Sequence, residues 1–130
     1  MPFTIEHIGI VVPDAAKMAE WYRDVLGFTV RSSNVNGENA GAFIVEADGK
    51  VMLELCQLSG VRPLREKLNH PLQFHLAFKS SNPDADAELL QQNGAKLIEK
   101  SAAAPGANYF ILLEDPWGNS LQLAKRVKSL

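Results

Sequence analysis

Two pairs of polar residues have the side chains and the spacing of a metal site. Glu54 follows His7 by 47 residues, and Gln122 follows His75 by the same 47 residues. Imidazole nitrogens, carboxylate oxygens and amide oxygens are all ligands for divalent cations. Glu54 and Gln122 each lie in the middle of a short apolar segment, MLELC or SLQLA. The equal spacing indicates that the chain holds two copies of one unit.

The same repeat relates other segments of the chain. The two pairs are offset by 68 residues, and at this offset MLELC aligns with SLQLA and AFIVE aligns with FILLE. IEHIGIVVPD and FHLAFKSSNPD also correspond, with the proline one or two places later in the second segment. A fixed offset between matching segments is the signature of an internal repeat. We therefore predict a single domain, residues 1–130, made of two modules at about 1–66 and 67–130.

Each module has the pattern of one strand, one helix and three further strands. In the first module, apolar alternation from Ile5 predicts the first strand, Asp14 predicts the N-cap of the helix, and Gly27 predicts its end. The predicted fold class is α+β, with two tandem βαβββ modules. The further strands of the first module are expected near 28–33, 41–47 and 50–57. The second module is expected to have a strand at 72–79, a helix at about 83–93 and three strands near 96–99, 107–114 and 119–126.

The last strand of each module is expected to turn one polar side chain away from its helix. Alternate residues of a strand point to opposite faces, so Leu53 and Leu55 on the helix side leave Glu54 on the other face. Gln122 has the same position between two leucines. A twofold relation between the modules would bring these faces together. We therefore expect a curved mixed sheet around a metal-binding cavity, into which His7, Glu54, His75 and Gln122 all point.

Four segments carry a resemblance to a known family. EHIGIVVPD, WYRDVLGF, FHLAF and EDPWGNSLQL resemble the vicinal oxygen chelate superfamily, which contains glyoxalase I, methylmalonyl-CoA epimerase, fosfomycin-resistance enzymes, extradiol dioxygenases and bleomycin-binding proteins. The resemblance spans nearly the whole chain, and glyoxalase I-like proteins look closest. It implies that the metal ligands are His7, Glu54, His75 and Gln122.

The sequence departs from the glyoxalase I pattern in two respects. The place of Gln122 usually holds a glutamate that acts as a base, so Glu54 is the expected catalytic base here. The positions with which such enzymes hold glutathione correspond to Val11 and Leu58, whose side chains cannot pair with a peptide carboxylate or amide. We therefore expect a substrate that is not linked to glutathione.

Other residues are weaker candidates for substrate contacts. Arg62 and Arg65 lie in the connector between the modules, where they could meet an anionic group. Phe43 and Phe110 could form part of an apolar wall, although aromatic residues in strands more often belong to the core.

The resemblance implies a metal-dependent, glyoxalase-like lyase or isomerase that acts on a small oxygenated molecule. A divalent ion (Zn, Ni, Co, Mn or Fe) would stabilise the enediolate that forms when a proton leaves the carbon next to a carbonyl. One alternative is a non-haem Fe(II) oxygenase, because two histidines and one carboxylate are its typical ligands. Another alternative is a drug- or metabolite-binding protein of the bleomycin-resistance kind.

The composition argues against several other classes of protein. The net charge is −2 and the only basic cluster is the tail KRVKSL, so we expect no nucleic-acid partner. No run approaches the ~18 apolar residues of a membrane span. The start MPFTIEHIGIVVPD lacks a signal-peptide pattern, and the single Cys56 cannot form an internal disulfide, so we expect a cytoplasmic protein. The resemblance further implies a homodimer that binds a small-molecule substrate.

Overall fold

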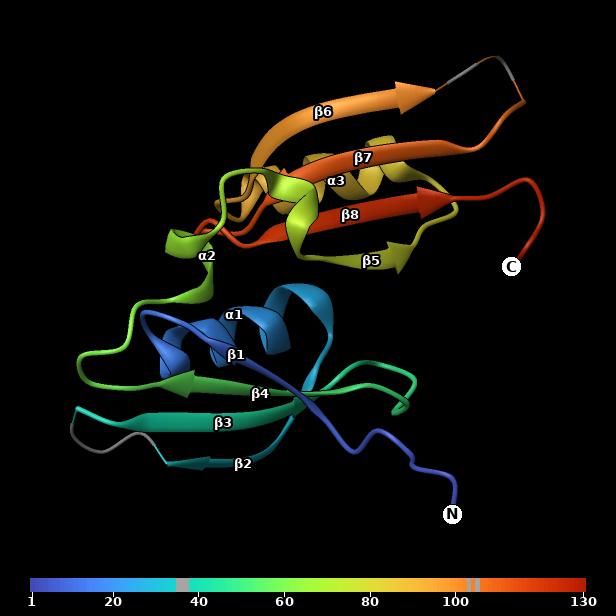
Figure 1. Ribbon diagram of the computed structural model, residues 1–130. Helices are drawn as coiled ribbons and strands as arrows, with labels where there is room; N and C mark the ends of the chain where they lie inside the picture. Colours follow the sequence, from blue (N-terminus) through green and yellow to red (C-terminus); the bar gives the residue numbers. More distant parts are fainter. Residues whose placement is uncertain (35–37, 103, 105) are drawn as a thin grey trace. The chain divides into compact units, whose positions relative to one another are not determined.

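The chain forms two compact units, Met1–Lys67 and Leu68–Leu130. The computed structural model describes residues 1–34, 38–102, 104 and 106–130 (Figure 1). Each unit is an α+β module with the order βαβββ, so the predicted order of elements is confirmed. The first unit contains β1 (Ile8–Val11), α1 (Ala15–Leu26), β2 (Thr29–Asn34), β3 (Ala40–Val45), β4 (Met52–Gln57) and the short helix α2 (Leu64–Lys67). The second contains the 3₁₀ helix η1 (Pro71–Gln73), β5 (His75–Lys79), α3 (Pro83–Gln92), β6 (Lys96–Ala102), β7 (Tyr109–Glu114) and β8 (Ser120–Lys125).

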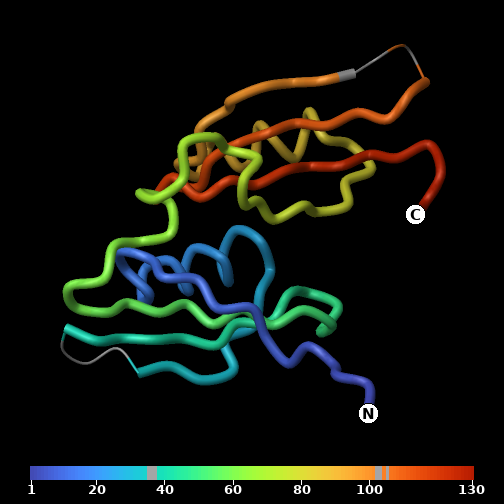
Figure 2. Tube along the Cα trace, viewed as in Figure 1, coloured from blue at the N-terminus to red at the C-terminus, as the bar shows by residue number. Residues whose placement is uncertain are grey.

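Both units have a four-stranded mixed sheet with the same topology, and the chain follows the same course through each (Figure 2). The strand order is β1-β4-β3-β2 in the first and β5-β8-β7-β6 in the second. The first and last strands of each module pair in parallel, and the other pairs are antiparallel. Gly9 lies opposite Glu54, and Ala77 lies opposite Gln122. The parallel pairs therefore keep the 68-residue offset of the sequence.

The predicted alignment of AFIVE with FILLE is wrong by one residue. Phe43 lies opposite Glu54 on β4, whereas Leu112 lies opposite Gln122 on β8. The counterpart of Phe43 is therefore Leu112 and not Ile111. The cause is the turn that follows, because the last pair is Val45 with Met52 in the first unit but Glu114 with Ser120 in the second. The second turn is one residue shorter, which shifts the register of β7 against the sequence repeat.

One helix covers one face of each sheet (Figure 1). Met18 and Tyr22 of α1 are fully buried, as are Leu53 and Leu55 of β4. The second unit repeats this pattern with buried Ala87 and Leu90 on α3 and with buried Ile111, Leu113, Leu121 and Leu123 on the sheet. The prediction that the leucines flanking Glu54 and Gln122 face inward is therefore confirmed. Burial of one such leucine contributes about 1.5–3 kcal/mol, which fixes the opposite orientation of the polar residue between two of them.

The ends of the helices follow from local chemistry. The Asp14 carboxylate accepts a hydrogen bond of 3.0 Å from the Lys17 backbone N–H, so the predicted N-cap of α1 is confirmed. Gly27 ends α1 with a φ of 76°, a backbone conformation that residues with a Cβ atom rarely adopt. No helix in the described part of the chain has both the length and the apolar character needed to cross a bilayer.

The strand predicted at 72–79 begins later, at His75, because the 3₁₀ helix η1 takes up residues 71–73. The His70 ring accepts a hydrogen bond from the Leu72 N–H at 3.1 Å, and the Gln73 side chain accepts from the His70 N–H at 2.9 Å. These two hydrogen bonds form a capping box that stabilises η1. Because η1 occupies these residues, the strand cannot begin before it ends.

Candidate metal and catalytic site

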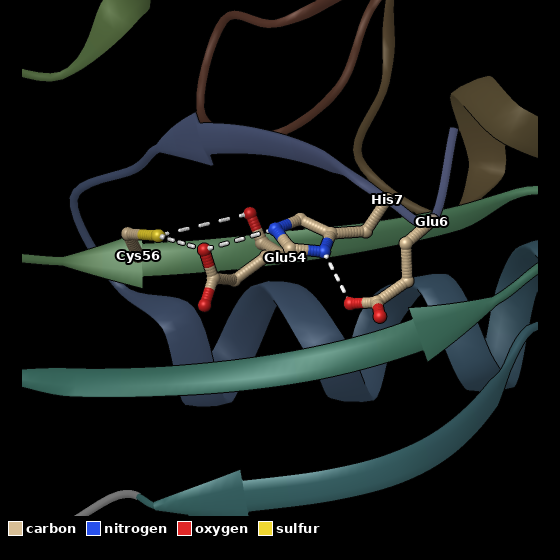
Figure 3. A network of polar contacts seen from close by, with 4 residues as sticks. All are labelled: Glu6, His7, Glu54 and Cys56. Carbon is tan, nitrogen blue, oxygen red and sulfur yellow. Dashed lines mark hydrogen bonds and ion pairs between the residues drawn. The ribbon is translucent and has the colours of Figure 1, made fainter. Parts of the chain in front are cut away.

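The first unit brings His7 and Glu54 together on the sheet face that does not carry α1. His7 immediately precedes β1, and Glu54 lies in the middle of the adjacent parallel strand β4. The His7 Nε2 and Glu54 Oε1 atoms are 3.7 Å apart, and each side chain is 33% exposed (Figure 3). A Cβ at Gly9 would lie 3.6 Å from Glu54 Oε1, in ordinary van der Waals contact, so the glycine leaves space beside the carboxylate. The contact is accessible from solvent and close enough for both groups to bind one ligand.

The His7 ring is oriented by two neighbours. Its Nδ1 atom is 3.0 Å from Glu6 Oε1 (Figure 3). Its ring packs edge-on against Phe43, with the ring centroids 5.3 Å apart. When Nδ1 donates to the carboxylate, Nε2 carries the lone pair and faces Glu54. Carboxylate partners of this kind are typical of histidines that bind metals. Phe43 therefore has an observed contact with His7, while its contact with a substrate stays a prediction.

Cys56 also belongs to this cluster, although a cysteine at such a position is more often a small buried filler. It lies two residues after Glu54 on the same face of β4, and its thiol donates to Glu54 Oε1 at 3.2 Å (Figure 3). Burial, the hydrogen bond to Glu54 and the negative charge of Glu54 together raise the pKa of the Cys56 thiol to about 11, and burial has the largest effect. The thiol is therefore neutral near pH 7 and acts as a donor to the carboxylate. The two-residue spacing along the strand predicts that Cys56 and Glu54 share one face, and the hydrogen bond between them is the feature that the sequence did not predict.

The second unit places His75 and Gln122 in the equivalent register. His75 begins β5, and Gln122 lies on β8 opposite Ala77, just as Glu54 lies opposite Gly9. The His75 Nδ1 atom is 3.1 Å from the Leu72 carbonyl oxygen. A proton on Nδ1 would satisfy that contact and leave the lone pair on Nε2, as in His7. Both histidines therefore have an acceptor at Nδ1, although one acceptor is a side chain and the other is backbone.

The four predicted ligands are divided between the units, with His7 and Glu54 in the first and His75 and Gln122 in the second. Within the residues that the structure describes, no three His, Cys, Asp or Glu side chains form a group that could hold a metal ion. The convergence of all four ligands on one ion therefore stays a prediction.

The chemistry of the first pair fits a divalent cation. Two ligands at about 2.1 Å from a tetrahedral ion lie roughly 3.4 Å apart, and His7 Nε2 and Glu54 Oε1 are 3.7 Å apart. The two donor atoms belong to ligand types that first-row metals and zinc prefer. His7 and Glu54 are therefore suited to bind an ion together, with little movement of either side chain.

The remaining predicted residues have other neighbours. Arg62 Nε is 3.9 Å from Glu66 Oε2, and Arg62 lines a cavity beside β1, whereas Arg65 lies on α2 outside that lining. Phe110 has the Arg126 guanidinium 5.1 Å above its ring. Contacts of Arg65 and Phe110 with a substrate stay predictions.

The sequence matches one protein-family model. The Glyoxalase/Bleomycin resistance protein/Dioxygenase superfamily model covers residues 4–123. A comparison with curated proteins gives no match.

Several solved structures have the same fold. A glyoxalase family protein from Bacillus cereus has 16% sequence identity and a TM-score of 0.77, over 98% of this chain and 97% of that one. A mutant of the fosfomycin resistance protein FosX from Listeria monocytogenes, in complex with Mn(II) and a dihydroxypropylphosphonic acid, has 16% identity and a TM-score of 0.72, over 97% and 94% of the two chains. TnmS3, an antibiotic binding protein from Streptomyces sp. CB03234, has 17% identity and a TM-score of 0.64, over 96% and 99%. At these identities the likeness shows the fold alone.

Proposed function

The chain belongs to the Glyoxalase/Bleomycin resistance protein/Dioxygenase superfamily, and from this premise we propose that it is a metal-dependent lyase or isomerase. It would remove a proton next to a carbonyl group of a small oxygenated substrate that is not linked to glutathione. The observation that carries the proposal is the 3.7 Å separation of His7 Nε2 and Glu54 Oε1, with an acceptor on the far nitrogen of the same ring. Many members of the superfamily are metal-dependent enzymes, and FosX was crystallised with Mn(II).

The proposed ligands are His7, Glu54, His75 and Gln122. A bound divalent ion would supply positive charge next to the substrate oxygen on which negative charge develops. Gln122 has no titrating group, so its role would be to bind through the amide oxygen or to hold a neighbouring ligand.

Glu54 is the proposed base. Its Oε1 atom faces His7 and Cys56, so Oε2 would accept the proton from the substrate carbon (Figure 3). The thiol of Cys56 would hold the carboxylate in this orientation while Oε1 remains near the ion. A single base of this kind suits a reaction that moves a proton from one face of the carbon, as in an isomerase or a lyase.

The test compares two substitutions in the metal-loaded protein. We expect Glu54→Gln to abolish proton exchange between solvent and the substrate carbon, because the amide cannot accept a proton. We expect Gln122→Ala to lower the affinity for the metal and to retain exchange once metal is in excess. Exchange can be followed by NMR in deuterated water with a panel of small hydroxy-ketones and oxo-acids, and metal affinity by titration. Equal retention of exchange in both variants would contradict Glu54 as the base.

The same experiment separates two other functions. Oxygen uptake with bound iron would instead favour an Fe(II) oxygenase built on His7, His75 and Glu54. Binding of a small molecule without bound metal and without proton exchange would favour a binding protein. TnmS3, which has the same fold, is an antibiotic binding protein.

A further inference from the structure

A cavity of about 490 Å³ lies in the first unit, between β1 and the segment that follows β4. Its lining includes Gly9 and Val11 from β1, Val61 and Leu64 as apolar wall, and two cations, Arg62 and Lys67. We propose that this cavity binds the anionic group, a carboxylate or a phosphate, of the substrate. The inference rests on the proposed function, because it places this group beside the Glu54 carboxylate. The volume is in the ~300–1,000 Å³ range of small-molecule sites.

The cavity carries two positive charges, and the carboxylates near it are Glu66 beside Arg62 and Glu54 beside Gly9. Lys67 has no ion pair among the described residues. Arg62 contacts Glu66 at 3.9 Å, but the two side chains are 73% and 57% exposed, so solvent screens this pair strongly. A guanidinium can present two parallel N–H groups to a carboxylate or phosphate, and an ammonium adds a mobile point charge. This arrangement favours an anion over a neutral ligand.

The backbone of β1 adds donors to the same cavity. β1 is an edge strand, and among the described residues its one partner strand in the sheet is β4. The Val12 N–H donates to the Cys56 carbonyl on that partner at 2.8 Å. In a parallel ladder alternate residues bond to the same neighbour, so the N–H groups of Gly9 and Val11 point to the open edge. Both residues line the cavity, and their amides can therefore donate to the anion.

The cavity borders the proposed base. Gly9 lies opposite Glu54, and a Cβ at Gly9 would be 3.6 Å from Glu54 Oε1. An anion held by Arg62 and Lys67 would thus bring the adjoining carbonyl carbon toward Glu54. The corresponding substrate class is a small hydroxy- or oxo-acid, or the phosphate ester of a hydroxy-ketone.

The test measures binding of inorganic phosphate and of acetate, in separate titrations, to metal-free protein by NMR. We expect saturable shifts of the Gly9 and Val11 amides that weaken as salt is added. Replacing both cations, Arg62→Gln with Lys67→Gln, should lower the affinity by about tenfold or more. The matched control is Arg31→Gln, which removes an exposed positive charge from β2 at the opposite edge of the same sheet and should leave the affinity within about twofold.

The outcomes separate this inference from the proposed function. The anion site is overturned if neither phosphate nor acetate binds. It is also overturned if the affinity for the anions falls equally in the double variant and in Arg31→Gln. The comparison of phosphate with acetate shows which group the site prefers. The Glu54→Gln variant should bind the anions at least as tightly as the original protein, because it removes a nearby negative charge. Anion binding with normal proton exchange in Glu54→Gln would uphold the cavity and refute the base.

Discussion

At the scale of single residues, one carboxylate oxygen of Glu54, Oε1, contacts two other side chains. His7 Nε2 lies 3.7 Å from Oε1, and the Cys56 thiol donates to the same atom at 3.2 Å. The raised pKa of the thiol keeps it protonated, so it adds a hydrogen bond without adding charge. Cys56 is therefore a positioning residue in the proposed mechanism, since it acts on the substrate only through Glu54.

Substitution of Cys56 tests this role. We expect Cys56→Ala to lower kcat for proton exchange about fivefold with little change in KM, because a hydrogen bond of this kind contributes about 1 kcal/mol. Cys56→Ser, which keeps a donor at the same place, should restore most of the rate. Steady-state kinetics on metal-loaded protein and thermal melts of each variant provide the measurement. A similar loss of kcat in both variants, or a loss that follows the melting temperature, would indicate a packing role instead.

The sequence predicted the pairing of His7 with Glu54 because both positions recur at one spacing in two modules. The two side chains lie close together because β1 and β4 are neighbouring parallel strands. The contacts around them were harder to predict. Glu6 and Cys56 reach the cluster through the rotamers of their side chains, and a residue pattern carries little information on rotamers. The outward direction of Glu54 could be predicted, since it follows from strand alternation.

At the scale of elements, the apolar residues that flank the polar position belong to the buried core of each unit. Leu121 of β8 is fully buried, and it is the counterpart of the equally buried Leu53 of β4. Both leucines pack under a helix while the next residue in the chain points to the opposite face. The orientation of Gln122 therefore depends on the burial of Leu121.

Truncation of this leucine tests the core of the second unit. We expect Leu121→Ala to lower the free energy of unfolding by about 2–5 kcal/mol, because it removes buried methyl groups and leaves a cavity. The control is Leu89→Ala on α3, where the side chain is 50% exposed and the change should be within about 1 kcal/mol. Urea denaturation followed by circular dichroism measures both. A loss at Leu121 no larger than the loss at Leu89 would contradict its place in the core.

Helix ends were predictable and strand register was not. Asp14 and Gly27 end α1 through local bonds that their residue types specify. The register of β7 depends on the length of the turn at 115–119, so an alignment of strand sequences alone placed Phe43 one residue away from its true counterpart, Leu112. The 3₁₀ helix η1 was also missed, because its cap uses a histidine as acceptor, and histidine is not among the usual capping residues.

At the scale of the whole molecule, the repeat predicted the architecture of both units. The same strand order occurs in each, and a register irregularity recurs at Val30–Ser32 in one and Leu97–Glu99 in the other. A repeat in the sequence cannot specify how its two copies associate, because that depends on surfaces rather than on internal periodicity. The shared metal site, the single domain and the homodimer therefore stay predictions.

Metal binding tests the largest of these predictions. If one ion takes ligands from both units, titration should give one divalent ion per chain, and a free metal concentration of 100 times Kd should stabilise the fold by about 2.7 kcal/mol. We expect His7→Ala and His75→Ala each to weaken binding by more than about 100-fold, since even residues that only orient a ligand commonly contribute 10–100-fold. The control is His70→Asn, which keeps an acceptor for the Leu72 N–H and should bind metal normally.

Calorimetric titration with zinc and with manganese, together with thermal melts, gives the stoichiometry and the affinity. Two ions per chain would mean that each unit binds its own metal ion. Tight binding that survives the loss of either histidine would mean that these residues are not the ligands. Either result would exclude a mechanism based on one shared ion.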